Sequence, residues 1–339
     1  MRFLVAQPGP AFSVQDVYVG WVEALKDLGH TAVEFNLDRR LAFYSSAEFE
    51  YEGERRHLSD DQVTEMAING LCASLYKVRP DVLLVVSGFF VPLALMDLAR
   101  KAYGTRVVVL HTESPYEDDR QLQVAEHADL NLLNDPTNID QFKQVSRAVY
   151  MPHAYRPTLH CPGPAKPELV CDLGFVGTGY QSRVDFFESM DLDGLDVLLG
   201  GNWQLLAEDS PLRKYLGHDI DKCLDNEETV DLYRSARVGI NLYRRESRKP
   251  ELSQGWAMGP REVEMAACGA FFLRDSRPEG DELLPMLPRF SSPAEASELL
   301  RWWLAHDRLR RDAAEAARVA VQNRTFTNHA KQLLRLLET

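Results

Sequence analysis

Residues 172–183, DLGFVGTGYQSR, combine a short apolar run, a turn with two glycines and the start of a helix. The run at residues 172–176 predicts a buried strand. Gly177 and Gly179 allow backbone N–H groups to approach a ligand, and Arg183 brings a positive charge to a helix N-terminus, where anions are favoured. The stretch therefore predicts a strand–turn–helix unit of an α/β fold with an anion site. The third glycine of the dinucleotide motif is missing, so the G-x-G spacing fits a tight turn without a ligand as well.

Strand and helix patterns alternate on both sides of this stretch. The expected strands are residues 2–6, 31–35, 81–86, 106–110 and 130–133 in the first half, and 172–176, 196–199, 237–242 and 271–273 in the second. The expected helices are residues 14–28, 63–75, 93–102, 119–127, 137–145, 182–190, 229–235, 260–268 and most of 294–337, with a break near 323–327. Such alternation builds doubly wound α/β domains. Residues 38–60 have no clear period and are expected to form a surface excursion.

A linker is expected between two comparable halves. The chain has 339 residues, and about 150 residues per domain makes two domains the prior. Five prolines among residues 151–170 disfavour both helix and sheet interior. We expect domains at residues 1–155 and 156–322, followed by a C-terminal helix at residues 323–339.

Composition limits the classes of function. Hydrophobic residues make up 45% and charged residues 26% of the chain, which excludes collagenous and disordered classes. The net charge of −13 disfavours nonspecific binding to nucleic acid. No apolar run approaches the roughly 18 residues of a membrane span, and the start of the chain does not resemble a signal peptide. Five cysteines without a C-x-x-C pair fit a reducing compartment, so we expect a cytoplasmic protein.

A basic loop follows the strand expected at residues 237–242. Residues 243–249, YRRESRK, include Arg244, Arg245, Arg248 and Lys249. Guanidinium groups at the carboxyl end of a strand suit a diphosphate. The alternative is a solvated loop whose charges pair with nearby glutamates.

A second candidate segment is residues 255–269, GWAMGPREVEMAACG. Pro260 suits the first position of a helix, so Arg261, Glu262 and Glu264 fall in its first turns. Glu262 is explained as well by the helix dipole as by a ligand. Glu264 could accept two ribose hydroxyls, and Arg261 could meet phosphate oxygens.

In the first half, His111 and Glu113 follow the strand expected at residues 106–110. At a strand end facing a cleft they could act as acid, base or electrostatic partner, and a structural histidine is the alternative. The acidic run at residues 117–119 is expected to cap a helix rather than bind a metal. His153, in the linker, could make a hinge contact or a donor contact.

These segments resemble the GT-B glycosyltransferases, and among them the CgeB-like group related to glycosyltransferase group 1. The matching strings are DLGFVGTGYQSR, DNEETVDLYRSARVGINLY, GPREVEMAACGAFFLRD and ELLRWWLAHDRLRRDAAEAARVAVQNRTFTNHAKQLL, which cover most of residues 172–336 in the family's order. In the first half TESPYEDDRQ, LLNDPTN and MPHAY match. The resemblance implies two Rossmann-like domains that face a central cleft, with a C-terminal helix crossing back to the first.

The resemblance also implies roles for residues. It assigns Glu264 to the donor ribose, Arg183 to the diphosphate, Gly177 and Gly179 to the donor-side turn, and Asn226 and Thr229 to the start of the nucleobase pocket; Tyr243 and Arg244 are expected to contact the donor as well. Related retaining families carry a second glutamate eight positions before the first, where this chain has Trp256. Arg261 is expected to take over part of that role, so both retention and inversion stay open.

The expected function is a metal-independent transferase of the hexosyltransferase type that uses a UDP- or GDP-sugar. His111, Glu113 and Arg261 are the expected catalytic residues, and the acceptor is expected to enter near residues 8–13 and 111–116. The acceptor could be a small molecule, a protein, a polymer or a modified DNA base. The alternatives are a sugar-nucleotide epimerase or hydrolase of the same fold, and a non-catalytic binding or assembly protein.

Overall fold

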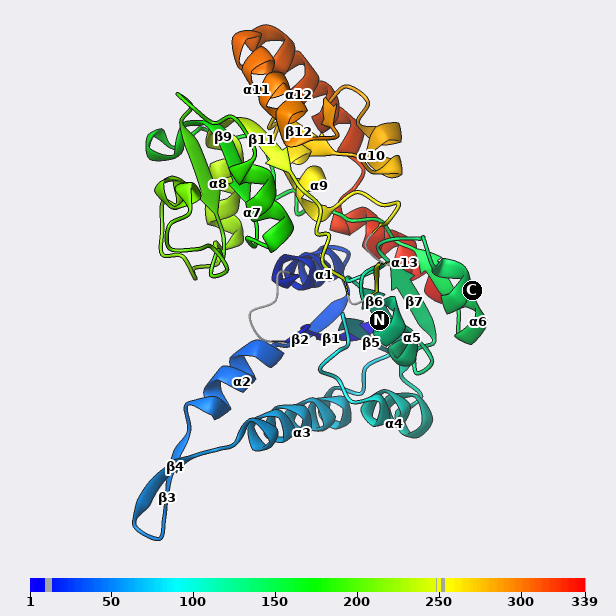
Figure 1. The fold of residues 1–339 in the computed structure, drawn as a ribbon. Helices are drawn as coiled ribbons and strands as arrows, with labels where there is room; N and C mark the ends of the chain where they lie inside the picture. Colours follow the sequence, from blue (N-terminus) through cyan, green and yellow to red (C-terminus); the bar gives the residue numbers. More distant parts are fainter. Residues whose placement is uncertain (10–13, 248, 251–253, 339) are drawn as a thin grey trace. The chain divides into compact units, whose positions relative to one another are not determined.

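The computed structural model describes residues 1–9, 14–247, 249–250 and 254–338. The chain forms two compact units (Figure 1). Unit 1 consists of Met1–Pro152 and the C-terminal segment that begins at Phe326, and unit 2 consists of His153–Thr325. The division thus lies after residue 152 where we expected it after 155, and the C-terminal segment starts at 326 where we expected 323.

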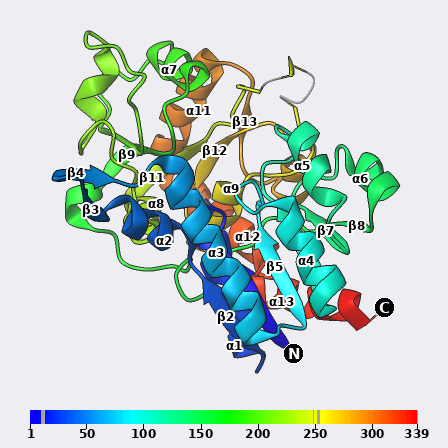
Figure 2. The ribbon, with the colours of Figure 1, turned by 90° about the horizontal axis from the view of Figure 1, so that it is seen from below.

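Unit 1 is built on a six-stranded parallel sheet with strand order β2-β1-β5-β6-β7-β8. Its strands are β1 (Arg2–Ala6), β2 (Thr31–Phe35), β5 (Val82–Val86), β6 (Arg106–His111), β7 (Leu130–Leu133) and β8 (Ala148–Tyr150). Its helices are α1 (Gln15–Asp27), α2 (Leu37–Ser45), α3 (Asp60–Val78), α4 (Leu93–Tyr103), α5 (Asp118–Ala125), α6 (Ile139–Val145) and α13 (Phe326–Glu338). Helices α3 and α4 cover one face of the sheet, and α1 covers the other (Figures 1 and 2).

The surface excursion expected at residues 38–60 contains regular structure. Helix α2 begins after Asn36, whose side chain accepts a hydrogen bond from the Arg39 N–H. A hairpin of β3 (Glu48–Tyr51) and β4 (Glu54–His57) follows and extends beyond α2 and α3 (Figure 1). Every residue of both strands is exposed. Strand β3 (EFEY) alternates polar and aromatic residues over only four positions, and β4 (ERRH) contains no apolar residue, so the pair gives little periodic signal.

Unit 2 is built on a five-stranded parallel sheet with strand order β10-β9-β11-β12-β13. Its strands are β9 (Cys171–Val176), β10 (Val197–Gly200), β11 (Ala236–Asn241), β12 (Phe272–Asp275) and β13 (Arg289–Phe290). Its helices are α7 (Gln181–Glu188), α8 (Asn226–Ser235), α9 (Pro260–Ala267), α10 (Pro278–Leu283), α11 (Pro293–Ala305) and α12 (Asp307–Val321), with short 3-10 turns at Pro167–Leu169 and Pro211–Tyr215. The α/β alternation expected from the sequence is confirmed in both units.

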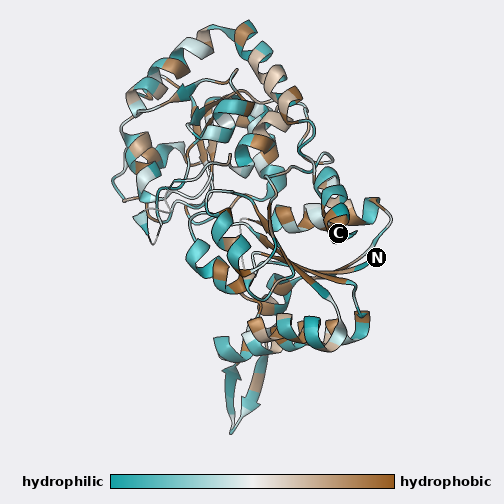
Figure 3. Ribbon diagram, turned by 90° about the vertical axis from the view of Figure 1, so that its right-hand side faces the viewer, coloured by the Kyte–Doolittle hydropathy of each residue, from teal (hydrophilic) through white to brown (hydrophobic). Residues whose placement is uncertain are grey.

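Apolar side chains concentrate on the sheets, whose strands stand out in hydrophobic colours (Figure 3). Helix α13 belongs to unit 1 although it follows unit 2 in the chain. It packs against α1, where Phe326 meets Trp21 edge to face at a centroid distance of 6.3 Å. Within the described residues, none of the helices has the length and apolar character of a membrane span.

Candidate functional site

The site is placed by the strand order of unit 2. Strand β9 lies between β10 and β11, so the connections leaving β9 and β11 turn to opposite sides of the sheet. Ligands of open parallel sheets bind at such a switch point, beyond the carboxyl ends of the strands. The two connections are the glycine turn after β9 and the basic loop after β11 that the sequence singled out.

The glycine turn is closely packed. A Cβ added to Gly177 would lie 2.9 Å from Nη2 of Arg261 and 3.1 Å from Nη1 of Arg183. Three residues from two separately predicted motifs therefore meet at one point. The Gly177 and Gly179 N–H groups, however, donate to the carbonyl oxygens of Gly200 and Asn202. The glycines thus permit close packing. Their N–H groups were predicted to approach a ligand, but in the structure they are engaged by backbone carbonyls.

Arg183 joins the two connections. Its side chain is only 3% exposed, and its guanidinium donates to the Thr178 carbonyl at 2.9 Å and to the Leu242 carbonyl at 2.8 Å. The ring of Tyr180 lies 5.2 Å from the guanidinium carbon. Arg183 therefore brings positive charge beside Gly177 while it holds the turn after β9 against the end of β11.

Arg261 is the other guanidinium at the turn. It is half-buried, in the first turn of α9, where the helix dipole also favours negative charge. Within the part of the chain that the structure describes, no hydrogen bond or ion pair engages it. An anion bound at the switch point would therefore find an uncommitted guanidinium beside a helix N-terminus.

Tyr243 and Glu262 pin the start of α9. The Glu262 carboxylate accepts hydrogen bonds from the Tyr243 hydroxyl and, at 3.0 Å, from the Gly259 N–H. Glu262 has no exposed surface, and burial raises its pKa to about 7. Burial, with the nearby Glu262 charge, also raises the pKa of Tyr243 well above its usual value. Tyr243 and Glu262 accordingly hold the start of α9 in place. Tyr243 also lines the cavity described below.

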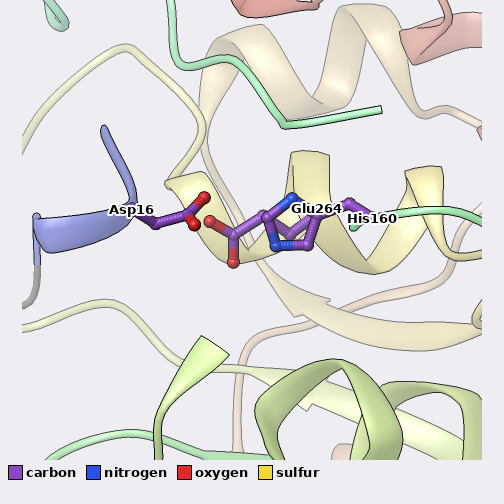
Figure 4. Close-up of side chains that lie close together, drawn as sticks. All are labelled: Asp16, His160 and Glu264. Carbon is purple, nitrogen blue, oxygen red and sulfur yellow. The ribbon is translucent and has the colours of Figure 1, made fainter. Parts of the chain in front are cut away.

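Glu264 follows Arg261 by three residues, about one helical turn along α9, and is partly exposed. A nitrogen of His160 lies within 4.8 Å of its carboxylate, and Figure 4 shows the two side chains next to each other. The His160 Nδ1 accepts a hydrogen bond from the Arg156 N–H at 3.2 Å. Sequence reasoning missed His160 because it stands in the proline-rich linker, far from α9 in the chain and without a motif of its own.

Two arginines of the basic loop after β11 already have partners in the protein. Arg245 pairs with Asp275 at 2.6 Å, and the Arg244 Nε donates to the Glu246 carbonyl. The Glu246 carboxylate accepts the Ser182 N–H at 3.0 Å, so a carboxylate already occupies the N-terminus of α7. A carboxylate of the protein thus takes the place expected for a ligand anion at that terminus. The ion pair of Arg245 is with Asp275 on β12, not with the nearby glutamates of the alternative. Arg248 lies outside the described residues.

A cavity of about 130 Å³ opens at the same edge of the sheet. It is lined by Ser182, Arg183, Phe186, Leu242, Tyr243, Arg245, Asp275, Phe290, Ser291 and Pro293. Asn226 and Thr229, expected at the nucleobase, lie in the first turn of α8, which Asp225 and Glu228 close with a capping box. Neither residue lines this cavity.

The first-half candidates are placed differently from what we expected. His111 has no exposed surface, its Nε2 lies 2.8 Å from the Asn131 side-chain oxygen, and its ring packs edge to face on Phe142. Burial lowers the pKa of His111 to about 4, so it is neutral at pH 7. The structural alternative therefore describes His111 better than a catalytic role, because a fully enclosed imidazole does not reach a substrate. The N–H of Glu113 donates to the Gln121 side chain.

The acidic run at residues 117–119 is structural in part. The Asp118 carboxylate is buried and accepts hydrogen bonds from Ser114, Gln121 and Asn138. Burial raises its pKa. His153 is the first residue of unit 2. The acceptor region expected at residues 8–13 falls mostly on residues 10–13, outside the described residues.

Comparison with known proteins now adds to this geometry. Residues 183–335 match the family model described as glycosyl transferase-like. That segment contains Arg183, α9 and most of the C-terminal helix α13. No curated protein matches the sequence.

Solved structures resemble the whole chain. A sucrose-phosphate synthase from Thermosynechococcus elongatus has 14% identity and a TM-score of 0.65, with 99% of each chain covered. An E. coli trehalose-6-phosphate protein bound with UDP-2-fluoro glucose has 13% identity and a TM-score of 0.66, covering 100% of this chain and 99% of that one. Anabaena HepE in complex with UDP has 12% identity and a TM-score of 0.59 over the full length of both chains. At these identities the likeness shows the fold, which is GT-B with two Rossmann-like units.

Proposed function

We propose that the chain is a metal-independent glycosyltransferase that takes a hexosyl group from a nucleotide-diphosphate sugar. The observation that carries the proposal is the meeting of Gly177, Arg183 and Arg261 at the switch point of unit 2. The match of residues 183–335 to a glycosyl transferase-like family supports the same reaction class. The order of the sequence motifs supports the CgeB-like group as the finer assignment. The cysteines are free thiols, which supports a reducing, cytoplasmic setting.

The diphosphate would bind between the glycine turn and the start of α9. Arg261 supplies an uncommitted charge there, and Arg183 adds positive potential from beneath while it fixes the turn. As the sugar leaves, negative charge grows on the diphosphate, and a preorganised guanidinium and helix N-terminus stabilise it more than water would. This is how Arg261 would act as a catalytic residue in place of the glutamate that Trp256 replaces.

The ribose would bind next to Glu264. Three residues along an α-helix span about 4.5 Å, so a carboxylate at 264 lies about one sugar–phosphate step from Arg261. Its two oxygens suit two vicinal hydroxyls, and His160 beside it limits the directions in which it can turn. UDP is the first nucleotide to test, because Anabaena HepE was solved with UDP and the E. coli protein with a UDP-sugar.

Calorimetry with UDP, UDP-glucose, GDP and pyrophosphate tests this placement. Arg261→Ala should weaken UDP and pyrophosphate alike by roughly 10- to 100-fold, as expected for a lost charge-assisted hydrogen bond. Glu264→Ala should weaken UDP by about tenfold and leave pyrophosphate unchanged, because pyrophosphate has no ribose. Arg237→Ala is the matched control, since Arg237 pairs with Asp172 at the opposite end of the sheet. Unaltered UDP binding in both site variants would refute the placement.

Trp256 in place of a second glutamate favours one alternative, a non-catalytic binding protein. Incubation of the protein with UDP-glucose, with and without a panel of acceptors, separates the possibilities. Sugar transfer supports the proposal, and release of free sugar without acceptor indicates a hydrolase. Tight binding with neither product indicates the binding protein.

A further inference from the structure

Glu279 is a buried carboxylate that serves two segments of unit 2. It lies at the start of α10 and is only 3% exposed. Sequence reasoning gave it no role. Its two carboxylate oxygens have different partners: one accepts from the backbone before α9, and the other pairs with Arg324.

The first partner segment leads into the proposed donor site. The Met258 N–H donates to Glu279 Oε2 at 2.8 Å, and the Glu279 N–H donates to the Trp256 carbonyl at 3.1 Å. The Arg277 guanidinium donates to the Gly255 carbonyl. Three hydrogen bonds thus hold residues 255–258, which directly precede Gly259, the N-cap of α9. A movement of this segment moves the helix end that carries Arg261.

The second partner segment is the joint through which the chain enters and leaves unit 2. Arg324 precedes Thr325, the last residue of the unit. Its carbonyl accepts the Tyr155 N–H at 2.9 Å, and Tyr155 bridges Thr325 in a parallel pairing. The Tyr155 hydroxyl donates to the Gln322 carbonyl. The incoming segment near residue 155 and the outgoing segment at 322–325 are therefore bound to each other, and Glu279 holds this joint through Arg324.

We propose that Glu279 is a positioning residue that links the segment before α9 to the joint at Tyr155 and Arg324. The part of the inference that concerns ligand binding rests on the proposed function; the link itself does not. Because both oxygens are buried and engaged, a shift of residues 256–258 is transmitted to the Arg324 guanidinium instead of being absorbed by water. Binding of a diphosphate at α9 would in this way reach the two segments through which the chain enters and leaves unit 2.

Hydrogen exchange without nucleotide tests the link. Arg324→Met removes the ion pair and lies outside residues 254–259, so it leaves the sequence of that segment unchanged. Glu279→Gln keeps an acceptor for the Met258 N–H but loses the negative charge. We expect Arg324→Met to speed exchange across residues 254–259 by roughly tenfold, and Glu279→Gln to speed exchange at residues 322–325 by a similar factor. Glu282→Gln, on the exposed side of the same helix, is the matched control. Unchanged exchange at residues 254–259 in Arg324→Met would overturn the proposal.

The same measurement with saturating UDP separates coupling from simple structural support. In the wild type, UDP should slow exchange at residues 254–264 and also at 153–158 and 322–325. In Glu279→Gln, and in Arg324→Met as the second variant, the slowing at 254–264 should persist and the slowing at the joint should disappear. Joint protection that survives in both variants would contradict the coupling. If UDP does not bind the wild type, the donor assignment fails, while the nucleotide-free exchange still decides the link.

Discussion

Two arginines at one glycine turn show how differently the same side chain can act. The guanidinium of Arg183 is spent on two backbone carbonyls, whereas that of Arg261 is uncommitted within the described residues. Both were predicted as anion ligands from the sequence. Only the structure separates them, because hydrogen bonds from Arg183 to Thr178 and Leu242 depend on how two distant loops pack.

Arg183→Ala and Arg261→Ala should therefore differ in stability. Removal of the Arg183 guanidinium leaves two carbonyls without a donor, so we expect a loss of about 2–3 kcal/mol in the free energy of unfolding. Arg261→Ala should stay within about 0.5 kcal/mol of the wild type, since no hydrogen bond or ion pair from the described residues engages this half-buried side chain. Urea denaturation measures both. Equal destabilisation by the two substitutions would contradict this distinction.

Glu262 should make stability depend on pH. Its pKa is raised from 4.5 to about 7 in the folded protein, so the folded state keeps a proton that the unfolded chain releases. The free energy of unfolding accordingly falls as the pH rises from 4.5 to 7, by up to about 3 kcal/mol for this group. In Glu262→Gln this loss should vanish, so the variant gains on the wild type between pH 5 and pH 7.5 in urea denaturation. Glu282→Gln should keep the wild-type pH dependence.

Among the elements, the glycine turn after β9 has two distinct halves. A Cβ at Gly179 would come within 2.4 Å of the indole of Trp203, a fully buried side chain. A Cβ at Gly177 would meet Nη2 of Arg261, the buried ring of Phe175 at 3.0 Å and Nη1 of Arg183. The Gly179 position thus faces the core, whereas the Gly177 position borders both the core and the proposed ligand site.

Gly179→Ala should thus lower the free energy of unfolding by about 1–3 kcal/mol, as overpacking of a core does. Gly177→Ala should also cost stability, because its φ of 159° is one that other residues rarely adopt and the ring of Phe175 lies close. It should in addition weaken UDP binding, because the new methyl group displaces the Arg261 guanidinium. Thermal denaturation and calorimetry of the same two variants measure both effects. Weaker UDP binding in Gly179→Ala together with unchanged UDP binding in Gly177→Ala would show that Gly179, not Gly177, borders the ligand.

The sequence predicted the regular elements well where a period or a breaker marks them. Strand β9 begins one residue before its expected start, and α9 begins at Pro260 as expected. The two-residue strand β13 and the short α10 were missed, because neither is long enough to show a period. The helical stretch expected at residues 294–337 divides a further time at His306, where neither proline nor glycine marks a break.

The candidate site was predictable only in part. Gly177, Arg183 and Arg261 converge because the carboxyl ends of parallel strands meet at one edge. The cap that Glu246 provides for α7 and the two-sided contacts of Glu279 depend on side chains far apart in sequence, which no local pattern encodes. The burial of His111 likewise comes from Asn131 and Phe142 on other elements.

At the scale of the whole molecule, the GT-B fold is assembled from a discontinuous first unit. The match to solved structures extends over nearly the entire chain. Helix α13 completes unit 1, where Arg147 donates to the Leu336 carbonyl and Gly20 leaves room for Phe326 on α1.

Phe326→Ala should destabilise unit 1 selectively. The phenylalanine is 4% exposed, and truncation of a buried aromatic side chain costs about 3–5 kcal/mol. Exchange protection of α1 in unit 1 should fall, while that of α8 in unit 2 should not. Lys331→Ala, at an exposed position of the same helix, is the control. A parallel loss at α8 would mean that the two units unfold together.

The late position of α13 also has a consequence for synthesis on the ribosome. At roughly 5–20 residues per second, translation of residues 28–325 separates the emergence of α1 from that of its partner helix α13 by on the order of fifteen to sixty seconds. During that interval Trp21 lacks the Phe326 ring that it contacts in the folded protein. Unit 1 can therefore be completed only after all of unit 2 has been synthesised, although most of unit 1 is translated first.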